Sequence, residues 1–167
     1  TRPNAISKTK TNDKQLLAKS NRRFSYSSFD DLVSVADDSD KLTIDYGHNH
    51  SRIRMVTSVD GRMKTKIYAG DCEIVESDGK TAMLTYIEGP GGVFAVCVVG
   101  ENGDKSYNYV HRDNLGSWNV ITDENAQLLQ ELSFDAWGNI RSSVDWESDA
   151  GADAIMYDRG FTGHEHI

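Results

Sequence analysis

Two His-x-His pairs carry the side chains best suited to chemistry in this sequence. They are His48-Asn49-His50 and His164-Glu165-His166. Alternate residues of a strand share a face, so two imidazoles at this spacing could bind one metal ion. Each pair lacks a clear third ligand, because the first falls in a predicted turn and the second at the end of the sequence. We therefore predict no metal site and interpret both pairs as surface or turn residues.

Other arrangements of reactive residues are incomplete as well. The acidic residues Asp37, Asp38 and Asp40 lack the pattern and the distal Glu of a calcium loop, which favours a solvated turn. No Gly-x-Ser-x-Gly elbow marks a nucleophile, and the glycine-rich segment 89–92 lacks the Lys and the helix of a phosphate loop. A pair of carboxylates that hydrolyses glycosides stays open, because acidic residues are abundant. We predict no catalytic residue and no cofactor, and we expect a protein that is not an enzyme.

The charge is acidic and unevenly distributed. The 167 residues hold 18 Lys and Arg against 26 Asp and Glu, a net charge of -8. Residues 1–23 hold seven of the basic residues and one Asp. The rest of the chain is strongly acidic and would repel a phosphate backbone, so we predict no nucleic-acid partner. The basic segment is interpreted as solvated, with a contact to an acidic partner as the alternative.

Neither a membrane span nor a disulfide framework is predicted. The longest apolar run, 93–99, has the length of a strand rather than of a membrane span. Cys72 and Cys97 are too few for a disulfide framework and lack metal-ligand spacing. We interpret them as small buried hydrophobic residues, and a single bridge between neighbouring strands stays open.

Short runs of alternating or β-branched residues, separated by compact Gly, Asp and Asn turns, predict an antiparallel meander. The strongest hairpin signal is Asp60-Gly61, which joins the runs 52–59 and 62–69. Further strands are predicted over 72–76, 81–87, 93–99, 104–111, 117–123 and 138–144.

The predicted strands differ in the faces that they bury. In the run 62–69, Met63 and Ile67 alternate with Lys64 and Lys66, which predicts one solvated face. The run 93–99 is apolar on both faces and should be the most buried strand. Three leucines in 127–134 fit either a strand or a helix, and periodicity alone does not decide between them.

Aromatic residues recur with an irregular period near twenty. Such a period is typical of an array of hairpins, in which an aromatic residue of one unit can stack on the next. Strands are rich in aromatic residues in any case, and this alone could produce a loose spacing. The residues are Tyr26, Tyr46, Tyr68, Tyr86, Tyr109 and Phe134.

Three segments carry a resemblance to a known family. Residues 107–117 read YNYVHRDNLGS, residues 132–138 read LSFDAWG, and residues 157–165 read YDRGFTGHE. These segments resemble the repeats and the core region of Rhs (rearrangement hot spot) and YD-repeat proteins. Asp45-Tyr46-Gly47 with Arg52 is similar to an earlier, degenerate repeat, and residues 2–6 resemble a preceding strand. The resemblance implies that the ambiguous run 127–134 is a strand.

The resemblance also implies an architecture and a function. It implies a mainly β fold with little helix, an antiparallel hairpin meander whose curved, twisted sheet forms part of a β-shell. In toxin members of the family such a shell encloses a C-terminal effector, and other members belong to adhesion proteins. Some members cut themselves beyond the region that corresponds to Ile167, so no protease residues can be assigned. The residues that match the repeat motifs are Tyr46, Arg52, Tyr109, Asp113, Leu115, Gly116, Phe134, Asp135, Trp137, Gly138, Gly160 and Gly163.

The sequence therefore predicts a structural piece of a longer bacterial surface or secreted protein. We expect a basic segment with the first strands over 1–40, the repeat sheet over 41–147 and the start of the core region over 148–167. The expected partners are the flanking repeats and the C-terminal domain of the parent chain, with edge-to-edge self-association of the isolated piece. A cell-wall or surface adhesion module is the alternative, in which Tyr107, Tyr109 and Trp118 would bind a saccharide or a protein.

The motif residues also make chemical sense as turns. In Asp135-Ala136-Trp137-Gly138-Asn139, the Asp can accept backbone N–H bonds, the Gly permits a positive φ, and the Trp can lie over the preceding strand. Residues 113–116 should form the same kind of turn. We expect valine at Gly116 or at Gly138 to strain the backbone and destabilise the fold.

Overall fold

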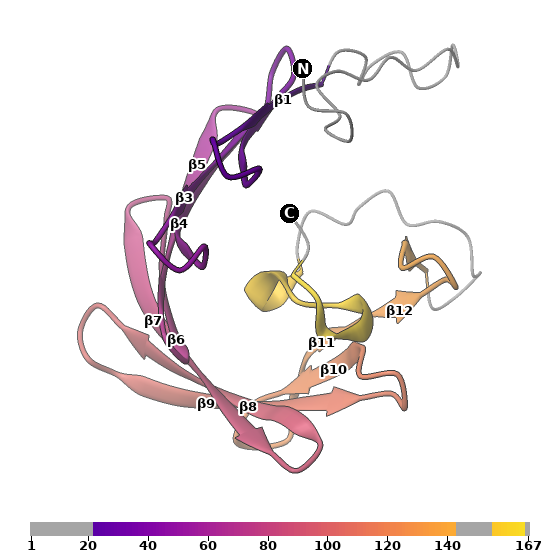
Figure 1. Cartoon of the computed structure of the whole chain (residues 1–167). Helices are drawn as coiled ribbons and strands as arrows, with labels where there is room; N and C mark the ends of the chain where they lie inside the picture. Colours follow the sequence, from indigo (N-terminus) through magenta and orange to yellow (C-terminus); the bar gives the residue numbers. More distant parts are fainter. Residues whose placement is uncertain (1–21, 143–154, 166–167) are drawn as a thin grey trace. The chain divides into compact units, whose positions relative to one another are not determined.

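The computed structural model describes residues 22–142 and 155–165. The chain divides into two compact units, residues 1–84 and residues 85–167. Figure 1 shows the strands, coloured by their position in the sequence. The predicted strand over 2–6, the end of the predicted strand 138–144 and His166 lie outside the described residues. Strands account for most of the described chain, and the helices are two short 3-10 turns.

Eleven strands form one sheet in which they lie in the order of the sequence, and a separate hairpin follows them. Antiparallel pairs join β1 through β6 in succession and β8 through β11 in succession. The mainly β fold and the antiparallel hairpin meander are therefore confirmed. The strands are β1 (Arg23–Tyr26), β2 (Leu32–Ala36), β3 (Lys41–Tyr46), β4 (Arg52–Val59), β5 (Arg62–Ala69), β6 (Cys72–Ser77), β7 (Lys80–Gly89), β8 (Gly92–Gly100), β9 (Lys105–Arg112), β10 (Trp118–Thr122), β11 (Leu128–Glu131), β12 (Ser133–Phe134) and β13 (Ile140–Arg141), and the 3-10 turns are η2 (Met156–Asp158) and η3 (Phe161–Gly163).

Two-residue turns fix the register of the central hairpins of the first unit. Asp60 and Gly61 have φ values of 49° and 78°, and Asp78 and Gly79 have φ values of 52° and 72°. Positive φ at both central residues is the requirement of the type I′ turn, whose twist matches that of the flanking strands. The Asp60-Gly61 turn sets Val59 opposite Arg62 in the pairing of β4 with β5, as the sequence predicts.

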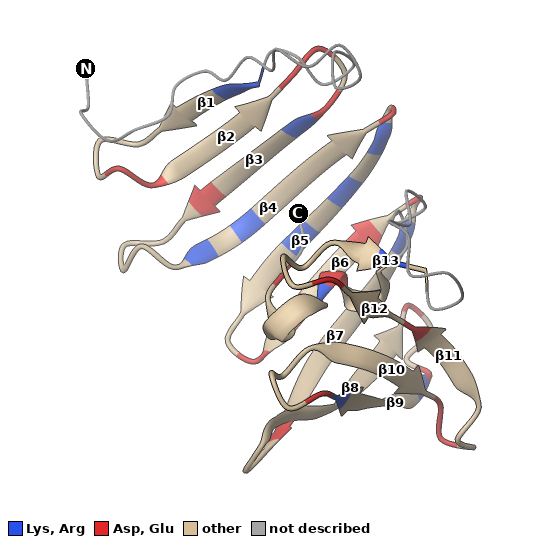
Figure 2. Cartoon of the chain, turned by 90° about the vertical axis from the view of Figure 1, so that its right-hand side faces the viewer, with Lys and Arg blue, Asp and Glu red and all other residues tan. Residues whose placement is uncertain are grey.

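The alternation along β5 is present, but the buried face is the one that carries charge. Lys66 is 1% exposed, whereas Met63 is 62% and Ile67 41% exposed. Lys66 lies 3.4 Å from the carboxylate of Glu73 on β6, and its ammonium lies 6.0 Å from the centre of the Tyr68 ring. Figure 2 shows the basic residues along β4 and β5. Pairing with a carboxylate allows the lysine to be buried, so the solvated face is the one with more apolar residues.

The core of the second unit is built from β8, β9 and β10. Ala95 and Val96 are adjacent on β8 and therefore point to opposite faces, and both are almost fully buried. This confirms that β8 is covered on both sides, although Phe94 remains 46% exposed. Val110 and Ile121 are cross-strand partners and both are buried.

The ambiguous run 127–134 is a strand, as the resemblance implies. It forms β11 and β12, and the backbone N–H of Leu132 between them donates to the carbonyl of Asn119. Leu128 and Leu129 are both exposed, so they do not form the apolar face that a helix would have buried.

Both cysteines are free and half-buried. Cys72 lies on β6 and Cys97 on β8, which are not neighbours in the sheet. The bridge between neighbouring strands is therefore wrong, and the two thiols are less deeply buried than predicted.

The period of the aromatic residues corresponds to one residue on every second strand. Tyr26, Tyr46, Tyr68, Tyr86 and Tyr109 lie on β1, β3, β5, β7 and β9, and Phe134 lies on β12. A step of about twenty residues is therefore the length of one hairpin with its turns.

Candidate functional site

A turn of five residues recurs along the described chain and determines the geometry of the candidate site. In each copy the first residue donates its N–H to the carbonyl of the fifth, and the fourth donates its N–H to the carbonyl of the first. In six copies this is the three-residue hairpin loop in which a type I turn is followed by a residue with positive φ. In the copy at 160–164 the third residue, Thr162, also has a positive φ, of 52°. We call it the five-residue turn, and its copies span 27–31, 47–51, 100–104, 113–117, 123–127, 135–139 and 160–164.

A side chain at the first position reinforces four of these turns. An Oδ1 atom of Asp113 accepts hydrogen bonds from the N–H groups of Leu115 and Ser117, at 2.8 and 2.9 Å. Asp123 and Asp135 bond the third and fifth residues of their turns in the same way. The hydroxyl oxygen of Ser27 accepts the corresponding pair of bonds in the first turn. The predicted role of the aspartates as turn acceptors is therefore confirmed at 113 and 135.

The fourth position of each turn has a positive φ. Gly116 and Gly138 have φ values of 89° and 85°, as the turn prediction requires. The same position holds Gly103 and Gly163, but also Asp30, His50 and Ala126. The prediction for Trp137 is wrong, because its side chain is 88% exposed at the tip of its turn and does not lie over a strand.

Hydrogen bonds within the turns lower the pKa of their carboxyl groups. The side-chain amide and the backbone N–H of Asn139 hold the pKa of Asp135 below its ordinary value. At Asp113, partial burial opposes the effect, but the bonds from Ser117 and Leu115 prevail and the pKa is lowered. The backbone N–H groups of Asp40 and Ser39 lower the pKa of Asp37, which forms a turn between β2 and β3. The acidic residues 37–40 are therefore a turn, as predicted.

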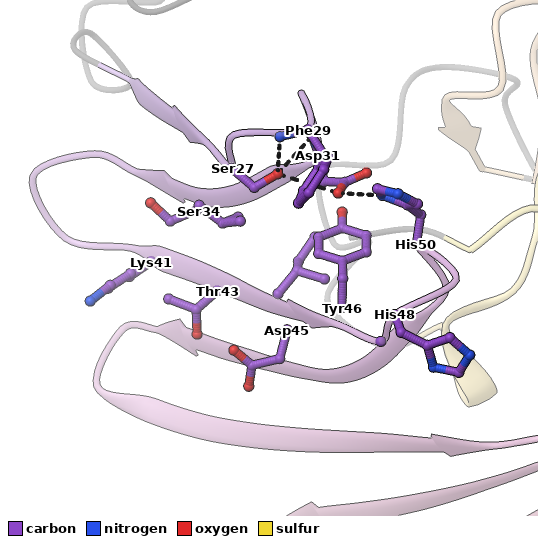
Figure 3. A pocket seen from close by; sticks show the side chains of 13 residues that line it. Ser27, Phe29, Asp31, Ser34, Lys41, Thr43, Asp45, Tyr46, His48 and His50 are labelled. Atoms are coloured by element: carbon purple, nitrogen blue, oxygen red, sulfur yellow. Dashed lines mark hydrogen bonds and ion pairs between the residues drawn. The ribbon is translucent and has the colours of Figure 1, made fainter.

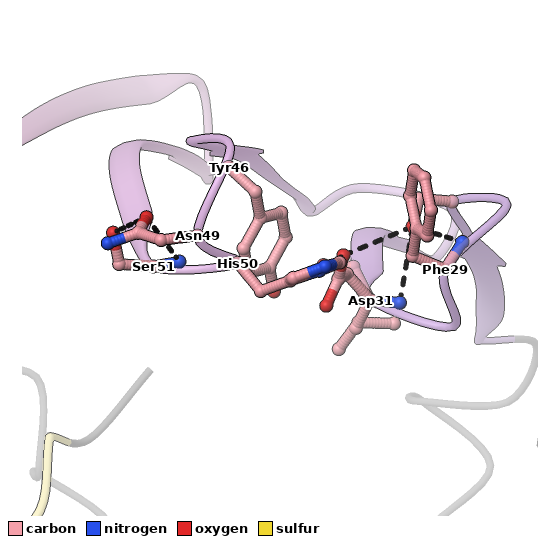
Figure 4. Close-up of polar contacts among 8 residues, drawn as sticks. Phe29, Asp31, Tyr46, Asn49, His50 and Ser51 are labelled. Atoms are coloured by element: carbon pink, nitrogen blue, oxygen red, sulfur yellow. Dashed lines mark hydrogen bonds and ion pairs between the residues drawn. The ribbon is translucent and has the colours of Figure 1, made fainter.

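In the first unit, two five-residue turns contact each other (Figure 4). The ring of Phe29, in the turn between β1 and β2, meets the imidazole of His50, in the turn between β3 and β4, edge to face with centres 5.2 Å apart. The Nδ1 atom of His50 lies 2.9 Å from a carboxylate oxygen of Asp31. The hydroxyl group of Tyr46 donates to the carbonyl of Leu32. Burial, and next the charge of Asp31, raise the pKa of Tyr46.

These residues line a hollow of the first unit, where the labelled side chains of Ser27, Asp31, Tyr46 and His50 gather (Figure 3). The hollow contains a serine, an aspartate and a histidine, but in an order that does not activate a nucleophile. The aspartate links the other two, because Ser27 Oγ donates to Oδ2 of Asp31 and Nδ1 of His50 contacts the same oxygen. A catalytic triad requires the histidine to contact the serine. The arrangement fastens two turns together.

The first histidine pair lies within the described residues, whereas His166 of the second pair lies outside them. His48 and His50 lie in a turn, as predicted, and His50 bonds Asp31. Among residues 22–142 and 155–165, no three His, Cys, Asp or Glu side chains gather in a way that could hold a metal ion. In the same residues no helix has the length and the apolar character needed to cross a membrane.

Arg52 and Tyr46, two of the predicted motif residues, lie together on the first unit. They are cross-strand partners in the pairing of β3 with β4, next to an irregularity in the register. The guanidinium of Arg52 lies 5.0 Å from the centre of the Tyr68 ring. An arginine on β4 thus lies between a tyrosine on β3 and a tyrosine on β5.

In the second unit, residues 155–165 return to the sheet and pack on β7, β9 and β11. The guanidinium of Arg159 lies 4.4 Å from the centre of the Tyr86 ring. The side-chain amide of Asn108 donates to the hydroxyl group of Tyr157. The backbone N–H of Met156 donates to the side-chain carbonyl of Gln130 at 3.0 Å.

The end of this segment packs on two five-residue turns. The N–H of Trp118 donates to the carbonyl of Gly160, and the hydroxyl oxygen of Ser117 accepts the N–H of Thr162. Phe161 packs on Phe134 with ring centres 5.9 Å apart. We call residues 155–165 the returning segment, and the residues that receive it the acceptor face, which comprises Tyr86, Asn108, Ser117, Trp118, Gln130 and Phe134.

The motif residues and the acceptor face overlap only in part. Gly116, Phe134, Gly138, Gly160 and Gly163 lie within the contact of the returning segment. Four acceptor residues are not predicted from the sequence, because their contacts join residues 26 or more positions apart. They are Asn108, Ser117, Gln130 and Tyr86, the last as the partner of Arg159.

The aromatic residues expected on an exposed binding surface separate into two groups. Tyr107 and Tyr109 are 38% and 42% exposed and lie on the face of β9 opposite Asn108. Trp118 is 2% exposed, so its predicted place on a binding surface is wrong. Leu115 projects from its turn and is 63% exposed.

No model of a protein family and no curated protein matches the sequence. The fold is similar to that of solved Tc toxin structures. A crystal structure of TcdB2-TccC3-TEV matches with a TM-score of 0.68 and 13% identity over 86% of this chain. A crystal structure of TcdB2-TccC3-Cdc42 matches with a TM-score of 0.64 and 14% identity over 90% of this chain. The Photorhabdus luminescens Tc holotoxin pore with a substituted TccC3 matches with a TM-score of 0.61 and 14% identity over 86% of this chain.

The matched region is a small part of the larger structures. This chain covers 8% of the length of each of the three matched chains. At such identities the likeness concerns the fold, and this chain has the strand arrangement of a short stretch of those toxin chains.

Proposed function

We propose that this chain is a non-catalytic structural segment of an Rhs/YD-repeat surface or secreted protein, in which it contributes strands to a β-shell that encloses or presents a C-terminal effector. The observation that carries the proposal is the order of the eleven strands. Because each strand pairs with its neighbours in sequence, hairpins added beyond β1 or β11 would lengthen the sheet without rearranging it. The partners are then the flanking repeats and the C-terminal domain of the parent chain.

The similarity to Tc toxin structures supports the shell in preference to an isolated sheet. Those structures are many times longer than this chain, which covers 8% of each of them. A short stretch of hairpins whose fold occurs within such chains is best explained as a building unit. The same comparison supports the proposed location at the cell surface or outside the cell and a role in toxin delivery.

The contacts of the reactive residues support a structural role. Asp31 and His50 join two turns, and Asp113 and Asp135 bond the backbone of their own turns. These side chains already bind partners within the sheet, as expected of residues that hold a shape.

The experiment that tests this proposal is intact-mass analysis of the full-length parent protein under native and denaturing conditions. A shell that holds an effector should give two pieces, cut downstream of residue 167, that stay associated in native buffer and separate in denaturant. A single uncut chain whose C-terminal part is digested by added protease as fast as an isolated domain would contradict the shell.

A saccharide-binding surface is the second candidate function. It is favoured by Tyr107 and Tyr109, whose half-exposed rings lie two residues apart on one face of β9. An imidazole and a hydroxyl group lie nearby, where Nε2 of His111 on β9 is 3.1 Å from the hydroxyl oxygen of Thr122 on the neighbouring strand β10. Stacking rings beside polar groups suit a sugar.

This candidate is tested by binding of the chain to cell-wall glycans. Tyr107→Ala and Tyr109→Ala should abolish binding, and Trp137→Ala, which removes another exposed aromatic ring, should leave it unchanged. Equal losses in all three variants would show nonspecific adhesion and contradict a saccharide site.

The open ends of the sheet predict edge-to-edge self-association of the isolated chain. β1 and β11 are the terminal strands of the sheet order. Sedimentation velocity over a range of concentrations should show dimers or larger species, and a strictly monomeric profile at high concentration would contradict this prediction.

A further inference from the structure

The contact between the returning segment and the acceptor face has the properties of a peptide in its binding site. It combines hydrogen bonds, an arginine on an aromatic ring and a pair of aromatic rings within eleven residues. Residues 142–154 separate the segment from Arg141, the last described strand residue, so the contact is not imposed by a short turn.

The acceptor face is positioned by the sheet itself. Asn108 is held on β9 between β8 and β10, where Val96 and Asn108 are cross-strand partners. Gln130 is held on β11 by its pairing with Ile121 of β10. Because strand pairing fixes the backbone positions of Asn108 and Gln130, the sheet can hold these residues in place before the segment binds.

An irregularity of the sheet provides the central hydrogen bond. The register of β9 with β10 shifts between Trp118 and Val120. Such a bulge releases a backbone group from the ladder. The N–H of Trp118 donates to the carbonyl of Gly160, which is itself buried. The bond is independent of the side chains and fixes the depth of the segment.

Side chains of the segment supply sequence specificity. Tyr157 bonds Asn108, Arg159 lies on Tyr86, and Phe161 packs on Phe134. Gly163 is favoured by its backbone, because its φ of 71° would strain any other residue, although a Cβ atom there would lie at an ordinary contact distance of 3.4 Å from the carbonyl oxygen of Gly116. The recognised pattern is therefore Tyr-x-Arg-Gly-Phe-x-Gly.

We propose that the acceptor face is a peptide-binding site for this pattern. It can bind a separate peptide as well as the returning segment of its own chain. The site takes a short peptide with a tyrosine, an arginine and a phenylalanine on alternate residues followed by a glycine. A second copy of the returning segment, from another chain, is the partner that fits it. Exchange of an identical segment between chains is a known route to association.

The first test offers the segment as a free peptide. The native segment competes with any added peptide, because its attachment gives it a high effective concentration. The chain therefore carries Arg159→Ala and Phe161→Ala, which weaken its own segment and leave the acceptor face intact. A fluorescent peptide with the sequence of residues 155–165 is titrated with this chain, and its anisotropy is measured. We expect saturable binding.

Matched controls separate recognition from adhesion. A peptide with the same two alanines should bind at least about 10-fold more weakly, because it lacks the contacts with two aromatic rings. In the weakened chain, Asn108→Leu should reduce binding of the native peptide, whereas Tyr107→Leu, the adjacent residue on the opposite face, should not. Equal binding of both peptides, or equal losses from the two leucine variants, would overturn the proposal.

The second test keeps every native contact and serves also if the weakened chain does not fold. A protease site replaces residues within 143–154 of the otherwise native chain, the chain is cut, and the products are separated by size-exclusion chromatography. The short fragment should elute with the body of the protein. It should be released when the cut chain also carries Arg159→Ala and Phe161→Ala. Release of the native fragment at micromolar concentration would overturn the proposal.

Discussion

Gly138 and Phe161 pack so closely that a Cβ atom at position 138 would lie 2.8 Å from the Cδ1 atom of the phenylalanine ring. Gly116 occupies the same position of another five-residue turn with nearly the same φ, but its closest neighbour, the carbonyl oxygen of Thr162, is 4.0 Å away. The two glycines therefore separate the cost of a left-handed backbone from the cost of a steric clash.

Valine should destabilise the protein at both positions and more at Gly138. Gly116→Val carries the cost of positive φ, roughly 1–3 kcal/mol, and Gly138→Val adds the clash with Phe161. Urea denaturation of both variants measures the difference. In a chain that already carries Phe161→Ala, Gly138→Val should cost less stability than it does in the native chain, because the clashing ring is gone. Equal losses at the two glycines would show that Phe161 moves aside.

Ala126 occupies a position that favours glycine. It has a φ of 59° at the fourth position of its turn and is exposed. Ala126→Gly should raise the free energy of unfolding by about 0.5–1 kcal/mol, because relief of the left-handed strain outweighs the added freedom of the unfolded chain. Ala136→Gly is the matched control, since Ala136 is exposed and lies outside the positive-φ region. It should lower stability, and a gain in both variants would contradict the argument.

The carboxyl group of Asp135 should contribute to stability only where it is ionised. Its pKa is lowered in the folded protein by the side-chain amide and the backbone N–H of Asn139. A group with a lowered folded-state pKa stabilises the fold above its unfolded-state pKa, near 3.9, and this contribution disappears as the pH falls through the folded-state value. Stability should therefore decline as the pH falls below about 4.

Carbon-detected NMR titration of the carboxyl groups measures this pKa directly. Asn139→Ala removes the side-chain amide that donates to the Asp135 carboxylate and is the main cause of its lowered pKa. The pKa of Asp135 should therefore rise toward its ordinary value. An unchanged titration midpoint in Asn139→Ala would show that the amide does not determine it.

The buried pair Lys66 and Glu73 should tolerate joint replacement better than the loss of one partner. Both side chains are at least 96% buried, at 1% and 4% exposure, and 3.4 Å separates their charged atoms. Lys66→Met leaves a buried carboxylate without this partner and should cost about 3–5 kcal/mol. Lys66→Met with Glu73→Leu removes both charges and should cost clearly less. Thermal denaturation compares the variants, and additive losses would contradict coupling of the pair.

Local chemistry made most of the strands predictable. The bounds of β4 and β5 follow from the turn Asp60-Gly61, because such a turn needs no distant contact to fix its register. Five-residue turns that begin with an aspartate and carry glycine at the fourth position are equally visible. The turn at 47–51 begins with glycine and carries His50 at its fourth position, so nothing in its composition marks the geometry.

The errors of sequence reasoning concern contacts between distant segments. Trp118 was expected on the surface, yet it is buried where residues 160–163 pack on it. Lys66 is buried by pairing across strands, which the alternation along β5 cannot reveal. The returning segment resembled a family motif, but its binding to Asn108 and Tyr86 depends on how the sheet brings β7 and β9 beneath it.

The five-residue turn places demands on very few of its positions. Its first residue forms backbone hydrogen bonds with the fourth and fifth residues and often provides a side-chain acceptor, and its fourth residue must adopt a positive φ. The third position is occupied by residues as different as Phe29, Asn49, Leu115 and Trp137. A sheet joined by such turns can change most of its turn residues and keep its strand order, which agrees with a similar fold at 13–14% identity. The variable third position also provides a projecting residue at which new specificity can arise while the scaffold stays unchanged.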